Sequence, residues 1–330
     1  MTEAVAIERL SQTMLAFFDA HAARGDSMTL VTVLSTEGSS YSKAGHPLLV
    51  SDSGELAGLL SGGCLENHLI ERCGETLRSG EPRLIEYDLR DDDELFGLGV
   101  GCEGVMRVLL YPTFSADDYA PIGSIRQRLR DREFVDLDVR SGESARHLRW
   151  IRPARLLVLG AGPDALPLLQ MCRSLGWRVT VNDHRPAWIA RVAADETTRV
   201  SQAAPGNLAR EVDLGDFDAA IVMSHNLDAD CDYLAQLATT DVGFVGLLGP
   251  PHRRERILGK IGQSSLLEGR LRSPVGIRIG GRGPGAIALE IVAELQAYFC
   301  DLDKRLATAA RSDGVSISID AGSNATVTTA

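Results

Sequence analysis

The sequence predicts an α/β protein in which an N-terminal α+β domain precedes a Rossmann-like, doubly wound parallel sheet. Three observations support this class. The chain has 330 residues, enough for two domains at roughly 150 residues each. A glycine-rich turn, Gly160–Ala165, joins an apolar run to a helical segment, and apolar runs and helical segments alternate after it. We expect domains at 1–150 and 151–310 and a flexible Ser/Thr/Ala/Gly-rich tail at 311–330.

Composition excludes several classes of protein. The chain is 44% hydrophobic and 24% charged, which is ordinary for a soluble globular protein. Its net charge of −11 argues against nucleic-acid binding, which needs a basic face. No apolar run approaches the ~20 residues of a membrane span, and the N-terminus does not resemble a secretory signal. We therefore expect a cytoplasmic protein without a membrane partner, whose six cysteines remain thiols.

The first half predicts a helix followed by short strands. A helix is expected over about Ile7–Ala23 and a strand over Met28–Leu34, followed by a hairpin of Pro47–Ser51 and Leu56–Leu60. Ser61–Cys64 opens a second helix that Gly74 or Gly80 ends. Strands are expected at 83–89 and 105–111, separated by an acidic and glycine-rich stretch. Residues 112–154 are Arg-rich with few long apolar runs, and we place the domain linkage there.

The second half contains a dinucleotide-binding pattern. The strand Arg155–Gly160 leads into G-x-G-x-x-A, a helix follows, and a second strand ends at Asp183. Gly160 makes the turn, and Gly162 lets a phosphate approach the helix N-terminus. Asp183 would accept the ribose hydroxyls, and the adjacent His184 and Arg185 leave a 2′-phosphate open. The alternative is a Rossmann fold with an empty or altered site.

Further polar groups and glycines follow later strands of this sheet. Ser224 and His225 come after the strand Ala219–Met223, and Gly249 comes after Val242–Leu248. Open α/β sheets bind ligands at the carboxyl ends of their strands, so these residues are candidates for the same site. Gly281 belongs to a glycine-rich loop before a long helix, Ala286 to about Ala307. His225 could equally be a helix cap.

Two glycine-flanked cysteines are candidate functional thiols. Gly62 and Gly63 precede Cys64 at a helix start, where the positive end of the helix dipole favours anions and thiolates. Cys102 is enclosed by glycines that permit a ligand to approach or simply allow a sharp turn. We expect both sulfurs to face one cleft between the domains, or else to be packing residues. Cys73 and Cys172 lie on apolar helix faces and are expected in the core.

In order along the chain, these motifs resemble the XdhC/CoxI family, accessory proteins of bacterial xanthine dehydrogenase-type molybdenum hydroxylases. The resemblance covers roughly residues 10–305, so the first domain is expected to be of the XdhC/CoxI type. The segments that carry it are Glu37–Ser40, Gly62–Glu66, Gly101–Val105, Gly160–Gly162, Ser224–Asn226, Gly246–Gly249, Pro274–Gly276 and Ile279–Arg282.

The resemblance implies a chaperone that carries the molybdenum cofactor, as molybdopterin or its cytidine dinucleotide. It implies assistance in sulfuration by a cysteine desulfurase, delivery to an apo-hydroxylase, and a homodimer. No permanent metal site and no assigned catalytic residue are expected, and turnover is less favoured than carriage. The expected cofactor-binding residues are Ser39, Ser40, Gly62, Gly63, Cys64, Cys102, Gly160, Gly162, Asp183, Ser224, His225, Gly249 and Gly281.

Two other functions fit parts of the sequence. An NAD(P)-dependent oxidoreductase would use the Rossmann site, with His225 as acid or base. A structural component of a hydroxylase complex would leave that site without a ligand. The cysteines of the first half favour the carrier, because a dehydrogenase does not require them.

Overall fold

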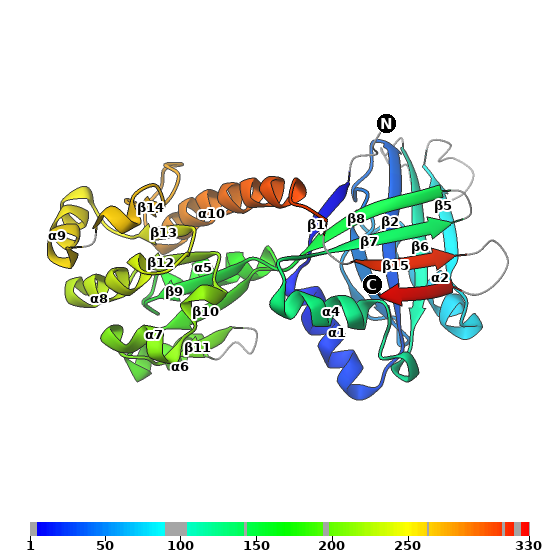
Figure 1. Cartoon of the computed structure of the whole chain (residues 1–330), viewed down its shortest axis with the longest axis horizontal. Helices are drawn as coiled ribbons and strands as arrows, with labels where there is room; N and C mark the ends of the chain where they lie inside the picture. The colour runs from blue at the N-terminus through cyan, green and yellow to red at the C-terminus, as the bar shows by residue number, and fades with distance from the viewer. Residues whose placement is uncertain are drawn as a thin grey trace. The chain divides into compact units, whose positions relative to one another are not determined.

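Chain contacts in the computed structural model divide the protein into two compact units. Unit 1 comprises residues 1–152 and 303–330, and unit 2 comprises residues 153–302. The structure describes residues 5–89, 104–141, 144–193, 198–262, 264–311, 314–319 and 325–329. Figure 1 shows both units, with labels on many of their helices and strands.

Unit 2 is a doubly wound sheet of six parallel strands. Its strand order, β11-β10-β9-β12-β13-β14, is the Rossmann order 3-2-1-4-5-6. The strands are β9 (Arg155–Leu159), β10 (Arg178–Asn182), β11 (Arg199–Ser201), β12 (Ala219–Val222), β13 (Phe244–Leu247) and β14 (Leu271–Arg272). The helices are α5 (Ala165–Ser174), α6 (Pro186–Val192), α7 (Leu208–Glu211), α8 (Leu227–Ala238), α9 (Pro251–Ile261) and α10 (Pro284–Ala307).

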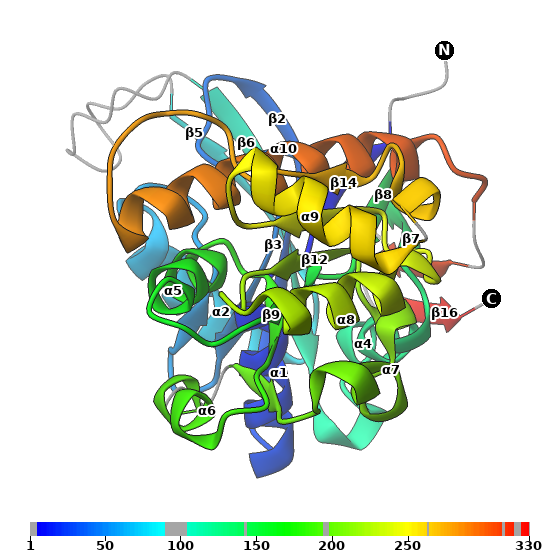
Figure 2. The ribbon, with the colours of Figure 1, turned by 90° about the vertical axis from the view of Figure 1, so that its left-hand side faces the viewer.

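Successive side chains along the strands of unit 2 point to opposite faces of the sheet, so the sheet has a hydrophobic core on each face. Leu156 and Val158 pack with α5 and α10 in one cluster. Leu157 and Leu159 pack with α7, α8 and α9 in the other. Helices therefore lie on both sides of the sheet (Figure 2), and the predicted fold class is confirmed.

Unit 1 is built on two five-stranded sheets. The first, of order β4-β3-β2-β6-β5, is antiparallel, and the second has the order β1-β8-β7-β15-β16. The first sheet contains β2 (Met28–Gly38), β3 (Pro47–Ser51), β4 (Leu56–Ala57), β5 (Arg83–Asp88) and β6 (Gly104–Thr113). The second contains β1 (Ala6–Arg9), β7 (Phe134–Ser141), β8 (Ser144–Ile151), β15 (Val315–Ile319) and β16 (Ala325–Thr329).

Facing side chains of the two sheets share one core, so we call this arrangement the unit 1 sandwich. Leu30 and Leu109 of the first sheet belong to the same buried cluster as Leu137 and Trp150 of the second. Helices α1 (Gln12–Arg24) and α4 (Ile122–Asp131) also contribute to this cluster. The opposite face of the first sheet packs against α2 (Glu66–Ser79), with Cys73 buried there as predicted.

Two segments of unit 1 differ from their sequence predictions. The predicted helix Ile7–Ala23 is strand β1 followed by α1. Ser11 caps α1 by accepting a hydrogen bond from the Thr13 N–H, and Ala6–Arg9 instead pairs in parallel with β8. The division between the units falls between Arg152 and Pro153, inside the predicted linkage region 112–154, although that region also contains α4 and the hairpin of β7 and β8.

The second difference is in the segment 311–330, predicted as a flexible tail, whose described residues include strands β15 and β16. Val315–Ile319 pairs in parallel with β7, and Ala325–Thr329 pairs antiparallel with Val315–Ile319. Val315 is fully buried in the unit 1 core. The alternation of Val315 with Ile317 and Ile319 is that of a strand, which the Ser/Thr-rich composition obscured.

Candidate functional site

The glycine turn after β9 has the geometry that the sequence predicted. Gly160 has φ +122°, and a Cβ there would lie 2.6 Å from the Met223 carbonyl oxygen. Only glycine fits this approach between β9 and β12. Gly162 faces His225, whose ring carbon Cδ2 lies 3.5 Å from the position of a Gly162 Cβ. The structure therefore brings Gly160, Gly162 and His225 together at the carboxyl end of the sheet.

Asp183 follows β10 as predicted, but its carboxylate binds groups of the protein. Oδ1 accepts from the Arg185 N–H and Nε at 3.0 and 2.9 Å. Oδ2 accepts from the Ala161 N–H at 2.9 Å and from Arg185 Nη2 at 2.7 Å. A carboxylate offers about four lone pairs, and these bonds use all of them. A ribose contact through Asp183 would therefore require Arg185 to leave.

These contacts also set the ionisation of Asp183. Burial acts to raise the pKa of its carboxyl group, but the hydrogen bonds from Arg185 and from the Ala161 N–H outweigh burial. The pKa lies below the ordinary value of 3.8 as a result. Asp183 is thus a buried, ionised residue that ties the glycine turn to the end of β10.

His225 occupies a strained position above the glycine turn. It is not glycine, yet its φ is +61°, and its Nε2 lies 2.9 Å from Asp164 Oδ2. Asp164 stands at the N-cap of α5 but makes no capping bond with its side chain. The site where a Rossmann fold receives a diphosphate therefore carries a carboxylate, which repels a phosphate group.

Ser224 and Gly249 are joined through two residues that sequence reasoning missed. The buried Asp230 of α8 accepts from the Ser224 hydroxyl and, at 2.6 Å, from Arg253 Nη2 of α9. Gly249 has φ +137°, and a Cβ there would lie 2.6 Å from Arg253 Cδ. Asn226 caps α8. This network fixes the loop that presents His225. Neither Asp230 nor Arg253 belongs to a sequence motif, so the sequence did not reveal the network.

Gly281 lies in an exposed loop before α10. Its φ is +122°, and a Cβ would lie 2.8 Å from Ala286 Cβ. The preceding segment is held on α10 by carboxylates: Glu294 accepts from the Gly276 N–H, and Glu290 accepts from the N–H groups of Ile279 and Gly280. The loop is thus ordered by its own helix.

Cys64 in unit 1 lies on an open glycine turn and is half-buried. A Cβ built on Gly62 or Gly63 would have no atom within 4 Å. The φ angle of Gly63 is +112°. Helix α2 begins at Glu66 with Leu65 as its N-cap, so Cys64 lies one residue before the cap rather than at it. The thiol is therefore close to the helix start and accessible to a ligand.

The Cys64 thiol begins a chain of hydrogen bonds. Its S–H donates to Ser61 Oγ at 3.3 Å, and the Ser61 hydroxyl donates to Glu66 Oε2 at 2.6 Å. Burial acts to raise the pKa of Glu66, but hydrogen bonds from the Ser61 hydroxyl and N–H lower it below its ordinary value. Ser61 and Glu66 were not predicted as site residues, although both flank the Gly-Gly-Cys motif.

The loop containing Ser39 and Ser40 lies beside this turn. Ser40 Oγ donates to the Ser42 carbonyl, and Ser42 Oγ donates to the Leu59 carbonyl at 3.0 Å. Ser39 is exposed and approaches Gly104, where a Cβ would lie 2.5 Å from the Ser39 carbonyl oxygen. Cys102 lies outside the described residues, so the expected pairing of Cys64 with Cys102 stays a prediction.

The described part of the chain contains no cluster of three or more His, Cys, Asp or Glu side chains that could hold a metal ion. Within the same residues, no helix is long and apolar enough to cross a membrane. Cys73 and Cys172 are buried, and burial raises the pKa of each thiol to about 12. This agrees with their predicted place in the core.

Comparisons with known proteins match both halves of the chain. Residues 21–88 match the model of the XdhC and CoxI family, and residues 156–295 match that of the XdhC Rossmann domain. The chain is 30% identical to a Bacillus subtilis protein described as a probable xanthine dehydrogenase subunit, over 82% of this chain and 92% of that protein. It is 24% identical to the "Molybdenum cofactor insertion chaperone PaoD" of Escherichia coli, over 86% of this chain and 87% of that protein.

A solved structure is similar over nearly the whole chain. It is a Bacillus halodurans protein described as a xanthine dehydrogenase, 25% identical, with a TM-score of 0.74, covering 88% of this chain and 96% of that one. The match therefore extends through both units. Together with the relative at 30% identity, these findings show that the chain belongs to the XdhC and CoxI family.

Proposed function

We propose that this chain carries the molybdenum cofactor as cargo, assists its sulfuration, and inserts it into a xanthine dehydrogenase-type hydroxylase. A relative aligned over 86% of this chain and 87% of its own is described as a molybdenum cofactor insertion chaperone, and another is described as a probable subunit of xanthine dehydrogenase. The observation within the structure that supports the proposal best is Cys64. Its half-buried thiol lies on a turn with open space beside both glycines.

Thiolate sulfur suits a molybdenum centre held by dithiolene sulfurs, because soft ligands pair with soft, sulfur-rich centres. The hydrogen bonds from Cys64 through Ser61 to Glu66 provide a route for the proton that the thiol must lose when it binds such a centre. Regaining that proton releases the cargo. A single protein ligand suits a carrier, since a closed set of ligands would retain the cofactor.

The proposal includes partners that follow from this chemistry. An apo-hydroxylase receives the cargo, and a cysteine desulfurase supplies the sulfur. We also propose that the protein is cytoplasmic, where Cys64 stays a thiol, and homodimeric. The cargo form is molybdopterin or its cytidine dinucleotide.

The second candidate is an NAD(P)-dependent oxidoreductase, which the Rossmann strand order of unit 2 favours. Two contacts weigh against it. Asp183 uses its oxygens on Arg185 and Ala161, and Asp164 places a carboxylate where a diphosphate would lie. We therefore rank cargo binding above nicotinamide turnover.

The test is to purify the chain from bacteria that make the molybdenum cofactor and to measure bound pterin by absorbance and mass spectrometry. We expect pterin on the wild type and a loss of at least tenfold in C64A. Cys300 is the matched control, because it is an exposed free thiol on α10. C300A should retain the wild-type amount.

Two results would contradict the proposal: equal pterin in C64A and C300A, or nicotinamide dinucleotide in place of pterin. A titration with NADH, followed by its fluorescence, tests the second candidate directly. Saturable binding that D183N abolishes would favour the oxidoreductase.

A further inference from the structure

We propose that a cavity between the two sheets of the unit 1 sandwich binds a small amphipathic carboxylate. This site is separate from the Cys64 turn and from the glycine turn of unit 2. Three features of the sandwich support this proposal: the side chains that the strand register directs inward, a cavity between the sheets, and the charges at the mouth of that cavity.

A bulge in β2 turns a hydroxyl toward the inside of the sandwich. Before the bulge, Leu30 faces the core between the sheets, and Val33 faces α2. Val33 pairs with Val108 but Ser35 pairs with Arg107, so Leu34 is the extra residue. Leu34 belongs to the inner core, and Ser35 lines the cavity beside it. Without the bulge, Ser35 would face α2.

Strand register also directs two arginines to the inside. On β6, Leu109 faces the core, and Arg107 is two residues away on the same face. On β8, Leu148 faces the core, and Arg146 is likewise two residues away. Arg146 pairs across the hairpin with Val139, another core residue. The inner face of each sheet thus changes from apolar residues to arginine at the same end.

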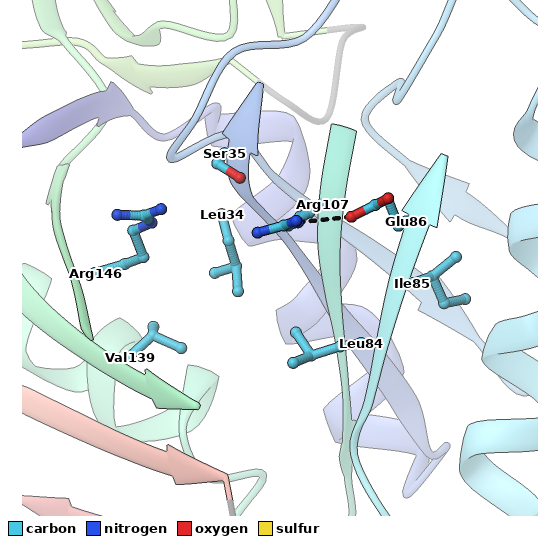
Figure 3. A pocket seen from close by; sticks show the side chains of 8 residues that line it. All are labelled: Leu34, Ser35, Leu84, Ile85, Glu86, Arg107, Val139 and Arg146. Carbon is cyan, nitrogen blue, oxygen red and sulfur yellow. Dashed lines mark hydrogen bonds and ion pairs between the residues drawn. The ribbon is translucent and has the colours of Figure 1, made fainter. Parts of the chain in front are cut away.

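A cavity of about 260 Å³ lies where this change occurs. Its floor is formed by the buried side chains of Leu34 and Val139, and Leu84 of β5 lines it while remaining 47% exposed. Figure 3 shows Leu34, Leu84 and Val139 between the strands that carry the two arginines. A pocket with an apolar floor and a few polar groups is typical of a small-molecule site.

The mouth of the cavity favours an anion. Arg107 Nε donates to Glu86 Oε2 at 2.7 Å, and the two side chains are 59% and 50% exposed, so water screens this pair. Among the described residues, that pair uses only Nε, which leaves both terminal nitrogens of Arg107 for a ligand. Arginine binds carboxylates through two parallel hydrogen bonds, and the Ser35 hydroxyl provides another donor.

These features define the ligand class. The head is a carboxylate that Arg107 and Arg146 attract, and the body is a short apolar chain or ring that reaches Leu34 and Val139. An amine head would meet two guanidinium groups against one carboxylate, that of Glu86, and an uncharged head would gain no ionic attraction from either arginine. A small free molecule fits better than a membrane surface, because the floor lies between two sheets.

The test is calorimetric titration of the full chain with octanoate, octan-1-ol and octylamine. We expect octanoate to saturate one site and the other two probes to bind at least tenfold more weakly. The double variant R107Q/R146Q should lose at least tenfold in octanoate affinity and leave octan-1-ol unchanged. R126Q is the matched control, because Arg126 is an ion-paired arginine of the same unit outside the cavity. It should bind octanoate as the wild type does.

A further variant separates the apolar floor from the charges. L84A removes an exposed wall residue and should weaken octanoate and octan-1-ol alike. Equal affinity for octanoate and octylamine would overturn the proposal, as would no saturable binding by wild-type protein whose circular dichroism shows it folded. Sedimentation with phosphatidylglycerol vesicles that R107Q/R146Q abolishes would assign the arginines to a membrane and would also overturn it.

Discussion

Arg149 is the residue whose replacement we expect to destabilise unit 1 most clearly. It lies on β8 and forms two hydrogen bonds with Asp136 of β7, at 2.6 and 2.9 Å. The side chains are only 2% and 4% exposed. Arg149 Nη1 also donates to the carbonyls of Leu306 and Ala309, at the C-terminal end of α10. One guanidinium therefore joins the hairpin to the last helix.

The expected cost of R149A follows from this burial. The substitution leaves a carboxylate in the core without its guanidinium, and removing one partner of a buried pair costs about 3–5 kcal/mol. For a unit of this size, each kcal/mol lowers Tm by about 2–4 °C, so we expect a fall of about 6–20 °C. The effect should appear in unit 1 alone.

The assay is urea unfolding followed by the fluorescence of Trp150, which is buried on β8. Replacing Trp177 and Trp188 of unit 2 by phenylalanine makes this signal report on unit 1. R126A is the control, because Arg126 also makes two hydrogen bonds to an aspartate, but the Asp19 side chain is 45% exposed. It should cost less than about 1 kcal/mol. Equal losses in R149A and R126A would show that burial of the Arg149–Asp136 pair does not set its contribution to stability.

Three other predictions concern stability and thiol reactivity. Because the pKa of Asp183 is lowered in the folded state, ionised Asp183 stabilises unit 2 above about pH 4, and this stabilisation is lost as the pH falls further. In acid titrations, D183N should therefore lose less unit 2 stability below about pH 4 than the wild type does. G160A should destabilise unit 2 by about 1–3 kcal/mol, because alanine would be strained at this φ angle. G259A should stabilise unit 2 by up to about 1 kcal/mol, because Gly259 lies on α9 and a Cβ there would have no atom within 4 Å. Calorimetry measures both, and a G160A variant as stable as the wild type would contradict the structure. Iodoacetamide should label Cys300 in the native protein and leave Cys172 unlabelled until urea is added. The thiolate is the reactive form, and burial raises the pKa of Cys172 to about 12. Peptide mass mapping measures the labelling, and Cys172 labelled before Cys300 would contradict the prediction.

Sequence reasoning predicted the elements whose residues carry a strong local pattern. The strand before Gly160, the turn itself and α5 were found because glycines and helical spacing coincide there. Strand β1 was missed because it has only four residues, two of them charged, which is too short for a hydrophobic periodicity. Its pairing with β8 joins segments far apart in the sequence. Hairpin β7–β8 was missed because the region is rich in arginine and has few long apolar runs, although its core residues alternate with charged ones as in a half-buried strand.

The candidate sites were predicted as positions but not as contacts. Glycines and polar residues at strand ends located Asp183 and His225 correctly. Their partners depend on loop conformations that no motif specifies: Arg185 turns back onto Asp183, and Asp164 reaches His225 instead of capping its own helix. The same holds for Ser61 and its bond to Glu66, which spacing did not reveal.

The function proposed for the chain is that of an insertion chaperone for a molybdenum hydroxylase. The most direct measurement is the activity and sulfurated cofactor content of that hydroxylase, purified from a strain that lacks this chain and from one that expresses it. We expect the hydroxylase to be made in both strains but, without this chain, to be nearly inactive and poor in sulfurated cofactor. A hydroxylase with full activity and full cofactor content in the strain lacking this chain would contradict the proposed function.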